Sequence, residues 1–260
     1  MKALILLTLI IIGFTSCEKV IDVDLNEANP VIAIEGSFSA EDSTVRVKIS
    51  LTANYFGTNQ PASVSDATVT IIDQNGITSS VPLIGDGYYE LQNYIPSFNT
   101  VYTLNVVHNG QSYSAQCKLF SAVPLNPLSY EYFPSFFGSD PGYAVFLNFD
   151  DPIGIENYYQ IVLTKNDTTL NTIPDYYTQD DQLTDGNTVS RPLFTLFDIA
   201  DTIDLEFRSI DKKVYDYINE IQATIGGNSS APANPTSNWS NKALGYFNAY
   251  SSSKGSIIIQ

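Results

Sequence analysis

Histidine and cysteine are scarce in this chain, and their scarcity excludes several classes of catalytic site. The 260 residues include one histidine and two cysteines, so zinc sites built from two histidines cannot form. The motifs H-E-x-x-H, G-x-S-x-G and C-x-x-C do not occur. A Ser-His-Asp triad would have to use His108, which precedes the turn sequence "HNGQ". We therefore expect no enzyme, no catalytic residue, no metal and no cofactor.

Basic residues are also few. There are 12 lysines and arginines against 28 aspartates and glutamates, which gives a formal net charge of -16. Such a field repels phosphate backbones and anionic headgroups, so we expect no nucleic-acid partner. An acidic, solvent-facing surface also favours solubility. The oligomeric state stays open.

No apolar run is long enough to span a bilayer. The longest, Ala3 to Phe14, follows the positive Lys2 and has 12 residues, about 18 Å of helix against a hydrocarbon core of roughly 30 Å. It predicts a signal peptide over residues 1–16. The following "FTSC" resembles a bacterial lipobox, although Phe14 stands where leucine is commonest. The resemblance implies acyl chains on Cys17, which anchor the protein to a membrane. The alternative is an ordinary signal with a coincidental cysteine.

Residues 17–30 predict a short polar tether, and the chain beyond them has the texture of a β-sandwich. The sequence "STVRVKISLTA" alternates apolar and polar side chains, as a half-buried strand does. Asn75-Gly76 and Asn109-Gly110 supply hairpin turns, and Tyr102 resembles the tyrosine corner of immunoglobulin-like folds. We expect an immunoglobulin-like β-sandwich over residues 31–121.

The second half predicts a second β-rich domain with one helix. Residues 122–129, with two prolines, indicate a linker, and residues 130–260 alternate again in "GYAVFLNFDDP" and "TIDLEFRSI". The segment "DKKVYDYINEIQATIGG" instead repeats apolar residues at helical spacing before a Gly226-Gly227 stop. The fold class is therefore mainly β, and Cys117, in an alternating run, is expected to behave as a small core residue.

Adjacent acidic residues are the remaining candidates for a catalytic or metal-binding site. Asp150-Asp151 and Asp180-Asp181 cannot form carboxylate dyads by themselves, because neighbours on a strand point to opposite faces. We expect them to be solvated loop acids. The segment "DDQLTDGN" fails the spacing of an EF-hand, but Asp180, Asp181 and Asp185 leave open a calcium site of another kind; a solvated turn is the preferred interpretation.

The polar loop Asn228 to Lys242 carries the only tryptophan, Trp239. Loops of this length without secondary structure are usually functional or disordered. We expect an ordered loop in which Asn238 and Asn241 bond to the backbone and Trp239 plugs the end of the second domain. The alternative is that Asn238, Trp239 and Tyr246 form a contact for a partner protein.

Four stretches in order, "SCEKVIDVDLNEANPVIAIEG", "ATVTIIDQNG", "GYY" and "NPTSNWSNKALGYFNAYS", resemble the domain of unknown function 4249 family. These are cell-envelope lipoproteins of Bacteroidota, and the resemblance covers essentially the whole mature chain. It implies two β domains and supplies no catalytic residues. Family genes often lie near those of TonB-dependent receptors, which implies an accessory role in transport.

The expected function is therefore a non-enzymatic outer-membrane lipoprotein, on the periplasmic or cell-surface face, with a TonB-dependent receptor as a possible partner. Acidic residues after Cys17 resemble surface-export signals. The alternatives are a carbohydrate-binding or glycan-processing surface module, since the chain has 17 tyrosines and 14 phenylalanines that could stack on sugars, and an adhesin or structural stalk.

Overall fold

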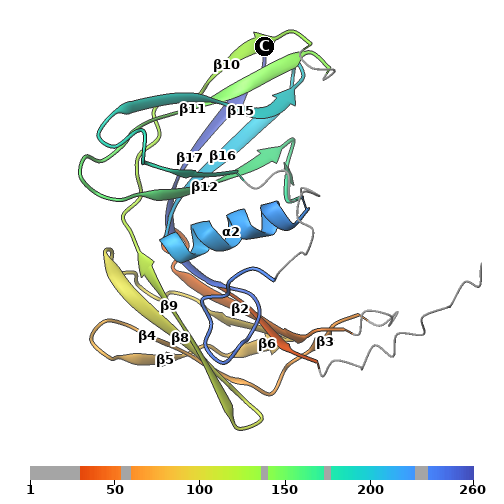
Figure 1. The fold of residues 1–260 in the computed structure, drawn as a ribbon, viewed down its shortest axis with the longest axis vertical. Coiled ribbons are helices and arrows are strands. Elements are labelled where there is room, and N and C mark those ends of the chain that lie inside the picture. Colours follow the sequence, from red (N-terminus) through yellow and green to blue (C-terminus); the bar gives the residue numbers. More distant parts are fainter. Residues whose placement is uncertain (1–29, 54–59, 136–139, 173–176, 226–233) are drawn as a thin grey trace, which may run out of the picture.

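The computed structural model describes residues 30–53, 60–135, 140–172, 177–225 and 234–260, which form a mainly β fold with one helix (Figure 1). The expected signal peptide, Cys17 and nearly all of the expected tether lie outside these residues, as does part of the polar loop. In the part described, no helix is long and apolar enough to cross a membrane.

The largest sheet runs through most of the molecule. Its strand order is β13-β12-β16-β17-β1-β2-β7-β6, with β14 beside β12 and β3 beside β2. The strands are β1 (Ile32–Ser39), β2 (Thr44–Leu51), β3 (Ala62–Ser63), β6 (Leu83–Gly85), β7 (Tyr88–Leu91), β12 (Tyr158–Lys165), β13 (Thr168–Thr169), β14 (Tyr177–Asp180), β16 (Thr202–Ile210) and β17 (Phe247–Ile258).

Two smaller sheets complete the strand content. One has the order β5-β4-β8-β9 and the other β10-β11-β15. Their strands are β4 (Thr68–Ile72), β5 (Thr78–Ser80), β8 (Thr100–His108), β9 (Gln111–Leu119), β10 (Ser129–Phe133), β11 (Gly142–Asp150) and β15 (Thr188–Phe197).

The N-terminal strands form a β-sandwich. Strand β2 buries Val45, Val47 and Ile49 and exposes Arg46 and Lys48, so the alternation predicted from the sequence is confirmed. The β1-β2-β7 part of the large sheet and the β5-β4-β8-β9 sheet contribute to one apolar core. The two sheet faces that meet in this core both bury aliphatic side chains, as the inner faces of sandwiches generally do.

The tyrosine corner is confirmed. Tyr102 near the start of β8 is 1% exposed, and its hydroxyl oxygen accepts a hydrogen bond from the Ser97 N–H at 2.7 Å. This bond to a backbone group a few residues upstream is the defining feature of the corner. Phe38 and Tyr94 pack edge-on against the ring, with centroids 5.0 and 6.0 Å from that of Tyr102.

A second apolar core lies between β10-β11-β15 and the other half of the large sheet. Phe149, Tyr159 and Phe207 form its aromatic centre, with ring centroids 4.6 to 5.3 Å apart. The expected linker 122–129 packs on this core, since Val123 in it is 4% exposed. That segment is therefore part of the folded body.

Helix α2 (Lys212–Ile225) confirms the predicted helix. Its Val214 and Ile218 are buried, and both belong to the first apolar core. The helix lies where the two halves of the molecule meet (Figure 1).

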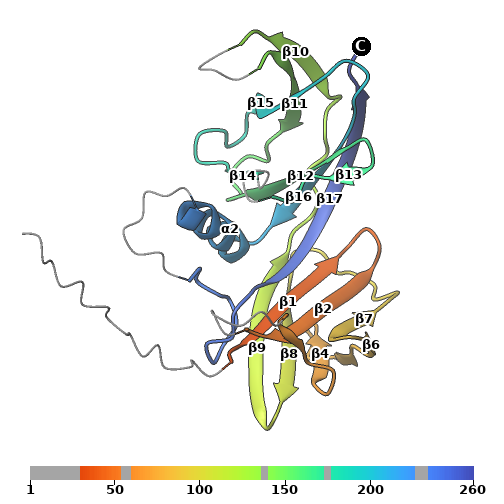
Figure 2. The ribbon, with the colours of Figure 1, turned by 90° about the vertical axis from the view of Figure 1, so that its right-hand side faces the viewer.

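Strand β17 connects the two halves, and this differs from the expected domain boundary. Residues 247–250 pair in parallel with β1, whereas residues 251–258 pair antiparallel with β16 (Figure 2). The expected second domain, 130–260, therefore contributes to the first core. The buried residues that it supplies from its C-terminal end are Trp239, Ala243, Phe247 and Ala249.

Candidate functional site

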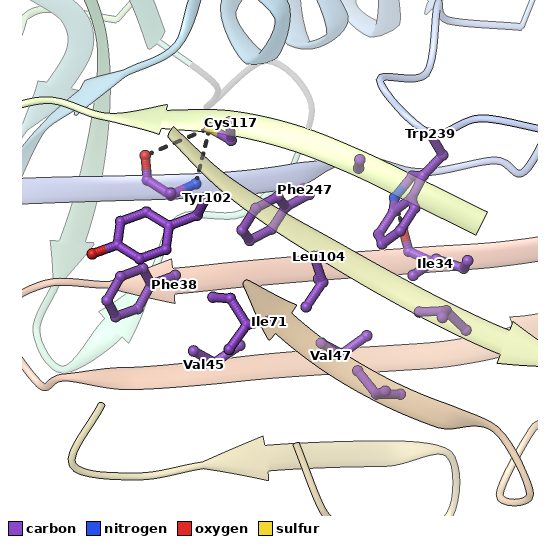
Figure 3. Close-up of a cluster of buried hydrophobic side chains, with 14 of the residues drawn as sticks. Ile34, Phe38, Val45, Val47, Ile71, Tyr102, Leu104, Cys117, Trp239 and Phe247 are labelled. Carbon is purple, nitrogen blue, oxygen red and sulfur yellow. Dashed lines mark hydrogen bonds between the residues drawn. The ribbon is translucent and has the colours of Figure 1, made fainter. Parts of the chain in front are cut away.

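The segment before β17 carries the residues that the sequence offered as a partner contact. Figure 3 shows the indole of Trp239 beside Ile34, and its Nε1–H donates to the Ile34 carbonyl oxygen at 3.0 Å. Trp239 is 6% exposed and forms an isolated bridge with Ala115 on β9. The expected plug is therefore present, but it closes the first core and not the second domain. The indole has little surface left for a partner.

The neighbouring asparagines bond to backbone groups, as expected. The Asn238 side chain donates to the Phe247 carbonyl oxygen at 2.8 Å and accepts from the Phe247 N–H at 2.9 Å. Asn241 donates to the Ser112 carbonyl oxygen at 2.6 Å. Each amide thus fixes the segment to a strand end.

Residues 244–246 extend the parallel pairing with β1 and place Tyr246. The Ile34 N–H donates to the Leu244 carbonyl oxygen at 2.9 Å, and the Gly36 N–H donates to that of Tyr246 at 2.8 Å. Gly245 between them has φ +93°, and an added Cβ would lie 2.2 Å from the Ile34 carbonyl oxygen. Only glycine allows this close approach.

Tyr246 lies at a cleft between the two halves of the molecule. Its ring packs against that of Tyr217 on α2, with centroids 4.9 Å apart. The cleft has a volume of about 530 Å³ and is lined by β1, β12, β16, α2 and residues 244–246. Clefts at such junctions are a common place for ligand sites. Its polar lining residues include Glu35, Gln160, Thr169, Asn171 and Arg208.

One cation and one acid face this junction cleft. Arg208 donates to Glu206 at 2.6 and 2.9 Å, reaches Gln160 at 3.4 Å, and lies 4.3 Å from the ring centroid of Tyr250. The guanidinium is therefore fixed in position. Burial raises the pKa of the Tyr217 phenol, and the charge of Glu35 adds to this effect. Tyrosine and arginine together suit a polar, partly aromatic contact.

The two members of an adjacent acidic pair have different partners, as expected, but not all of these acids are solvated. Asp150 accepts from Thr188 at the surface, whereas Asp151 accepts from the buried Tyr159 hydroxyl at 2.7 Å. Asp151 and Asp181 are each 5% exposed, so the expectation of solvated loop acids is wrong for both.

The acids that come together also differ from the set that the sequence left open as a calcium site, which was Asp180, Asp181 and Asp185. Asp180 turns away and accepts from the Tyr215 hydroxyl at 2.9 Å. Instead, Asp151 joins Asp181 and Asp185, with one carboxylate oxygen from each within 4.8 Å of the others. The sequence contained a partial indication that Asp151 takes part, because this residue directly follows the alternating run that forms β11.

The two residues that could support nucleophilic chemistry have other roles. His108 Nδ1 lies 3.0 Å from an Asp66 oxygen, and its other ring nitrogen contacts the Asn109 amide at 2.9 Å. Cys117 is 1% exposed and its sulfur accepts from the Ala249 N–H at 3.1 Å. Burial raises the pKa of the thiol, so the expected small core residue is confirmed.

Comparisons with known proteins identify a family but no activity. The model of the family described as "Domain of unknown function (DUF4249)" matches residues 18–256. No curated protein matches the chain. A two fibronectin type-III domain segment from chicken tenascin aligns with 10% identity over 88% of this chain and 99% of its own, with a TM-score of 0.25. That score is too low to carry an argument. The family match covers most of the sequence, and the chain therefore belongs to the DUF4249 family.

Proposed function

We propose that this protein is a non-enzymatic lipoprotein, held at the outer membrane by acyl chains on Cys17, that assists a TonB-dependent transport system. The observation that carries the proposal is the position of Cys17. It follows a short apolar run and the small residues of "FTSC", and the family match begins at the next residue. A cysteine placed directly ahead of the first residue of the family match is the position expected of a lipid attachment site.

The finer architecture that we propose is two β units joined by one strand. Two separate apolar clusters support this layout, one in the immunoglobulin-like sandwich and one beneath β10-β11-β15. Strand β17 hydrogen-bonds to strands of both units. An unbroken strand across a junction resists bending, so the two units would keep a fixed orientation relative to each other.

The partner contact that we favour is the junction cleft. Asn238 and Trp239 then act by positioning, since their bonds fix the segment that ends in Tyr246. Tyr246 and Tyr217 provide an aromatic wall, and Arg208 provides a fixed charge. Tyrosine and arginine are the residue types that most often dominate protein contacts.

Co-purification from native membranes tests the proposal. The tagged full-length protein, solubilised in detergent, should recover a TonB-dependent receptor identified by mass spectrometry. The double variant Y217A/Y246A should lose the receptor while remaining in the membrane fraction. A matched control is Y132A, because Tyr132 is 57% exposed on β10, which does not line the cleft. Repeated recovery of the wild-type protein alone contradicts the proposal.

The second candidate function is carbohydrate binding. The same cleft favours it, because two tyrosine rings stand beside Glu35, Gln160 and Arg208, and sugar sites combine aromatic faces with polar groups. A glycan array probed with the full-length protein in detergent separates the two. Binding that Y217A/Y246A abolishes favours this candidate, and no binding to any glycan removes it.

A further inference from the structure

Three carboxylates from two separate stretches of the sequence converge in the C-terminal half of the chain. Asp151 follows β11, and Asp181 and Asp185 lie in the turn between β14 and β15. One oxygen from each lies within 4.8 Å of the other two. We call these three residues the acidic cluster. It is separate from the junction cleft, whose lining does not include them.

Backbone hydrogen bonds hold the acidic cluster in place. The Asp185 N–H donates to the Asp181 carbonyl oxygen at 2.9 Å, and the Asp151 N–H donates to that of Asn187 at 3.0 Å. The Gly154 N–H donates to an Asp185 carboxylate oxygen at 2.6 Å. The two loops are thus tied together, and the carboxylates are brought close by the fold itself.

The negative charge of the cluster has no cationic partner. Asp151 and Asp181 are 5% exposed, and across the described ranges no lysine, arginine or histidine forms a salt bridge with any of the three. Burial raises the pKa of the Asp151 carboxyl, and the neighbouring charges of Asp181 and Asp185 raise it further. Buried charges are normally paired or bound to a metal.

Buried oxygens without partners belong to a residue of the cluster and to two residues whose N–H groups bond to Asp181, and this observation is independent of the carboxylate spacing. Asp151 Oδ2, Asn157 Oδ1 and Thr184 Oγ1 are buried and have no hydrogen-bond partner. Asn157 is 7% exposed, and its N–H donates to Asp181 Oδ2 at 2.8 Å, which places it against the cluster. Buried polar atoms nearly always have a partner. An acceptor-rich pocket of this kind suits a cation.

We propose that the acidic cluster binds one Ca²⁺ ion through its three carboxylates, with Asn157 Oδ1 as a further ligand. All the donors are oxygens, which selects a hard cation and excludes a zinc site of cysteines and histidines. The three carboxylate oxygens lie within 4.8 Å of one another, close enough to share one cation. Ca²⁺ is preferred to Mg²⁺ because Mg²⁺ usually keeps several of its waters, whereas Ca²⁺ takes six to eight oxygen ligands, mostly from the protein. The ion would join the loop after β11 to the turn before β15.

Calorimetric titration of the full-length protein, purified in detergent and stripped with EGTA, tests the site. We expect one Ca²⁺ per chain, with half-saturation at or below about 1 mM, the range of extracellular modules. D151N should weaken binding at least tenfold, because it removes a ligand charge and leaves an oxygen for the Tyr159 hydroxyl. The matched control D150N should bind as the wild type does, since Asp150 bonds Thr188 and Asn126 outside the cluster.

The melting temperature gives a second readout, because D151N should shift it in opposite directions in EGTA and in Ca²⁺. In EGTA, D151N should melt above the wild type, because it removes an uncompensated buried charge; in Ca²⁺ it should melt below. If D151N does not fold, D185N replaces it, since Asp185 is exposed. The proposal is overturned if Ca²⁺ neither binds nor raises the wild-type melting temperature. Weak binding of several ions that D151N leaves unchanged also overturns it. Neither result bears on lipidation or on the junction cleft.

Discussion

Replacement of Trp239 by alanine is expected to destabilise the N-terminal sandwich, although the residue lies in the C-terminal part of the sequence. The indole is 6% exposed within the first core and bonds the Ile34 carbonyl oxygen. The substitution leaves a cavity between β1 and β9. It also loosens the segment that leads into β17.

The magnitude follows from burial and from the single hydrogen bond. Truncation of a buried aromatic residue to alanine costs about 3–5 kcal/mol, and we expect W239A to fall in this range. W239F keeps most of the apolar area and removes the indole N–H, so it should cost at least about 1 kcal/mol. The order wild type, W239F, W239A is therefore expected for the free energy of unfolding.

Urea unfolding followed by far-ultraviolet circular dichroism measures these values. Because the chain has one tryptophan, wild-type fluorescence reports docking of this segment alone, and its transition should coincide with the dichroism. F194A is the matched control, since Phe194 is 79% exposed and should change stability by no more than about 0.5 kcal/mol. A loss below about 1 kcal/mol for W239A, or native emission typical of exposed indole, refutes the reasoning.

Three further substitutions test other parts of the fold by chemical denaturation. Y102F should cost about 1–3 kcal/mol, because it removes the partner of the Ser97 N–H; an unchanged midpoint contradicts the tyrosine corner. Burial opposes ionisation of Asp201, but bonds that include the one from Lys165 at 2.7 Å hold the pKa of Asp201 below its ordinary 3.8. The ionised Asp201 side chain therefore stabilises the folded protein above pH 3.8, and this contribution is lost as the pH falls below that value. D201N should lower the free energy of unfolding at neutral pH but not in acid. A difference from the wild type that does not depend on pH contradicts this. G245A should reduce folded yield severely, since its Cβ has no space beside β1; normal folding would show that residues 244–246 do not pair there.

Local features of the fold were predictable because their signals are local. The alternation in β2 and the helical spacing of α2 follow from which side chains share a face. The Asn109-Gly110 turn between β8 and β9 follows from positive φ angles of 48° and 75°. The hydrogen bond between the Tyr102 hydroxyl and the Ser97 N–H also joins residues that are only five positions apart.

Long-range pairing could not be predicted in the same way. Strand β17 looks the same in sequence whether it pairs with β16 alone or also with β1, more than 200 residues earlier. The assignment of Trp239 to the second domain failed for this reason. The acidic cluster depends likewise on a fold that brings Asp151 to Asp181, whereas the sequence left open a site with Asp180 in its place and preferred a solvated turn.

The mass of the N-terminal peptide of the native protein tests the central claim most directly. After proteolysis of protein extracted from cell membranes, the account predicts that the mature chain begins at Cys17 and carries more than one acyl chain, with the protein in the outer-membrane fraction. A mature N-terminus with an unmodified thiol, together with protein free in the medium, would contradict it.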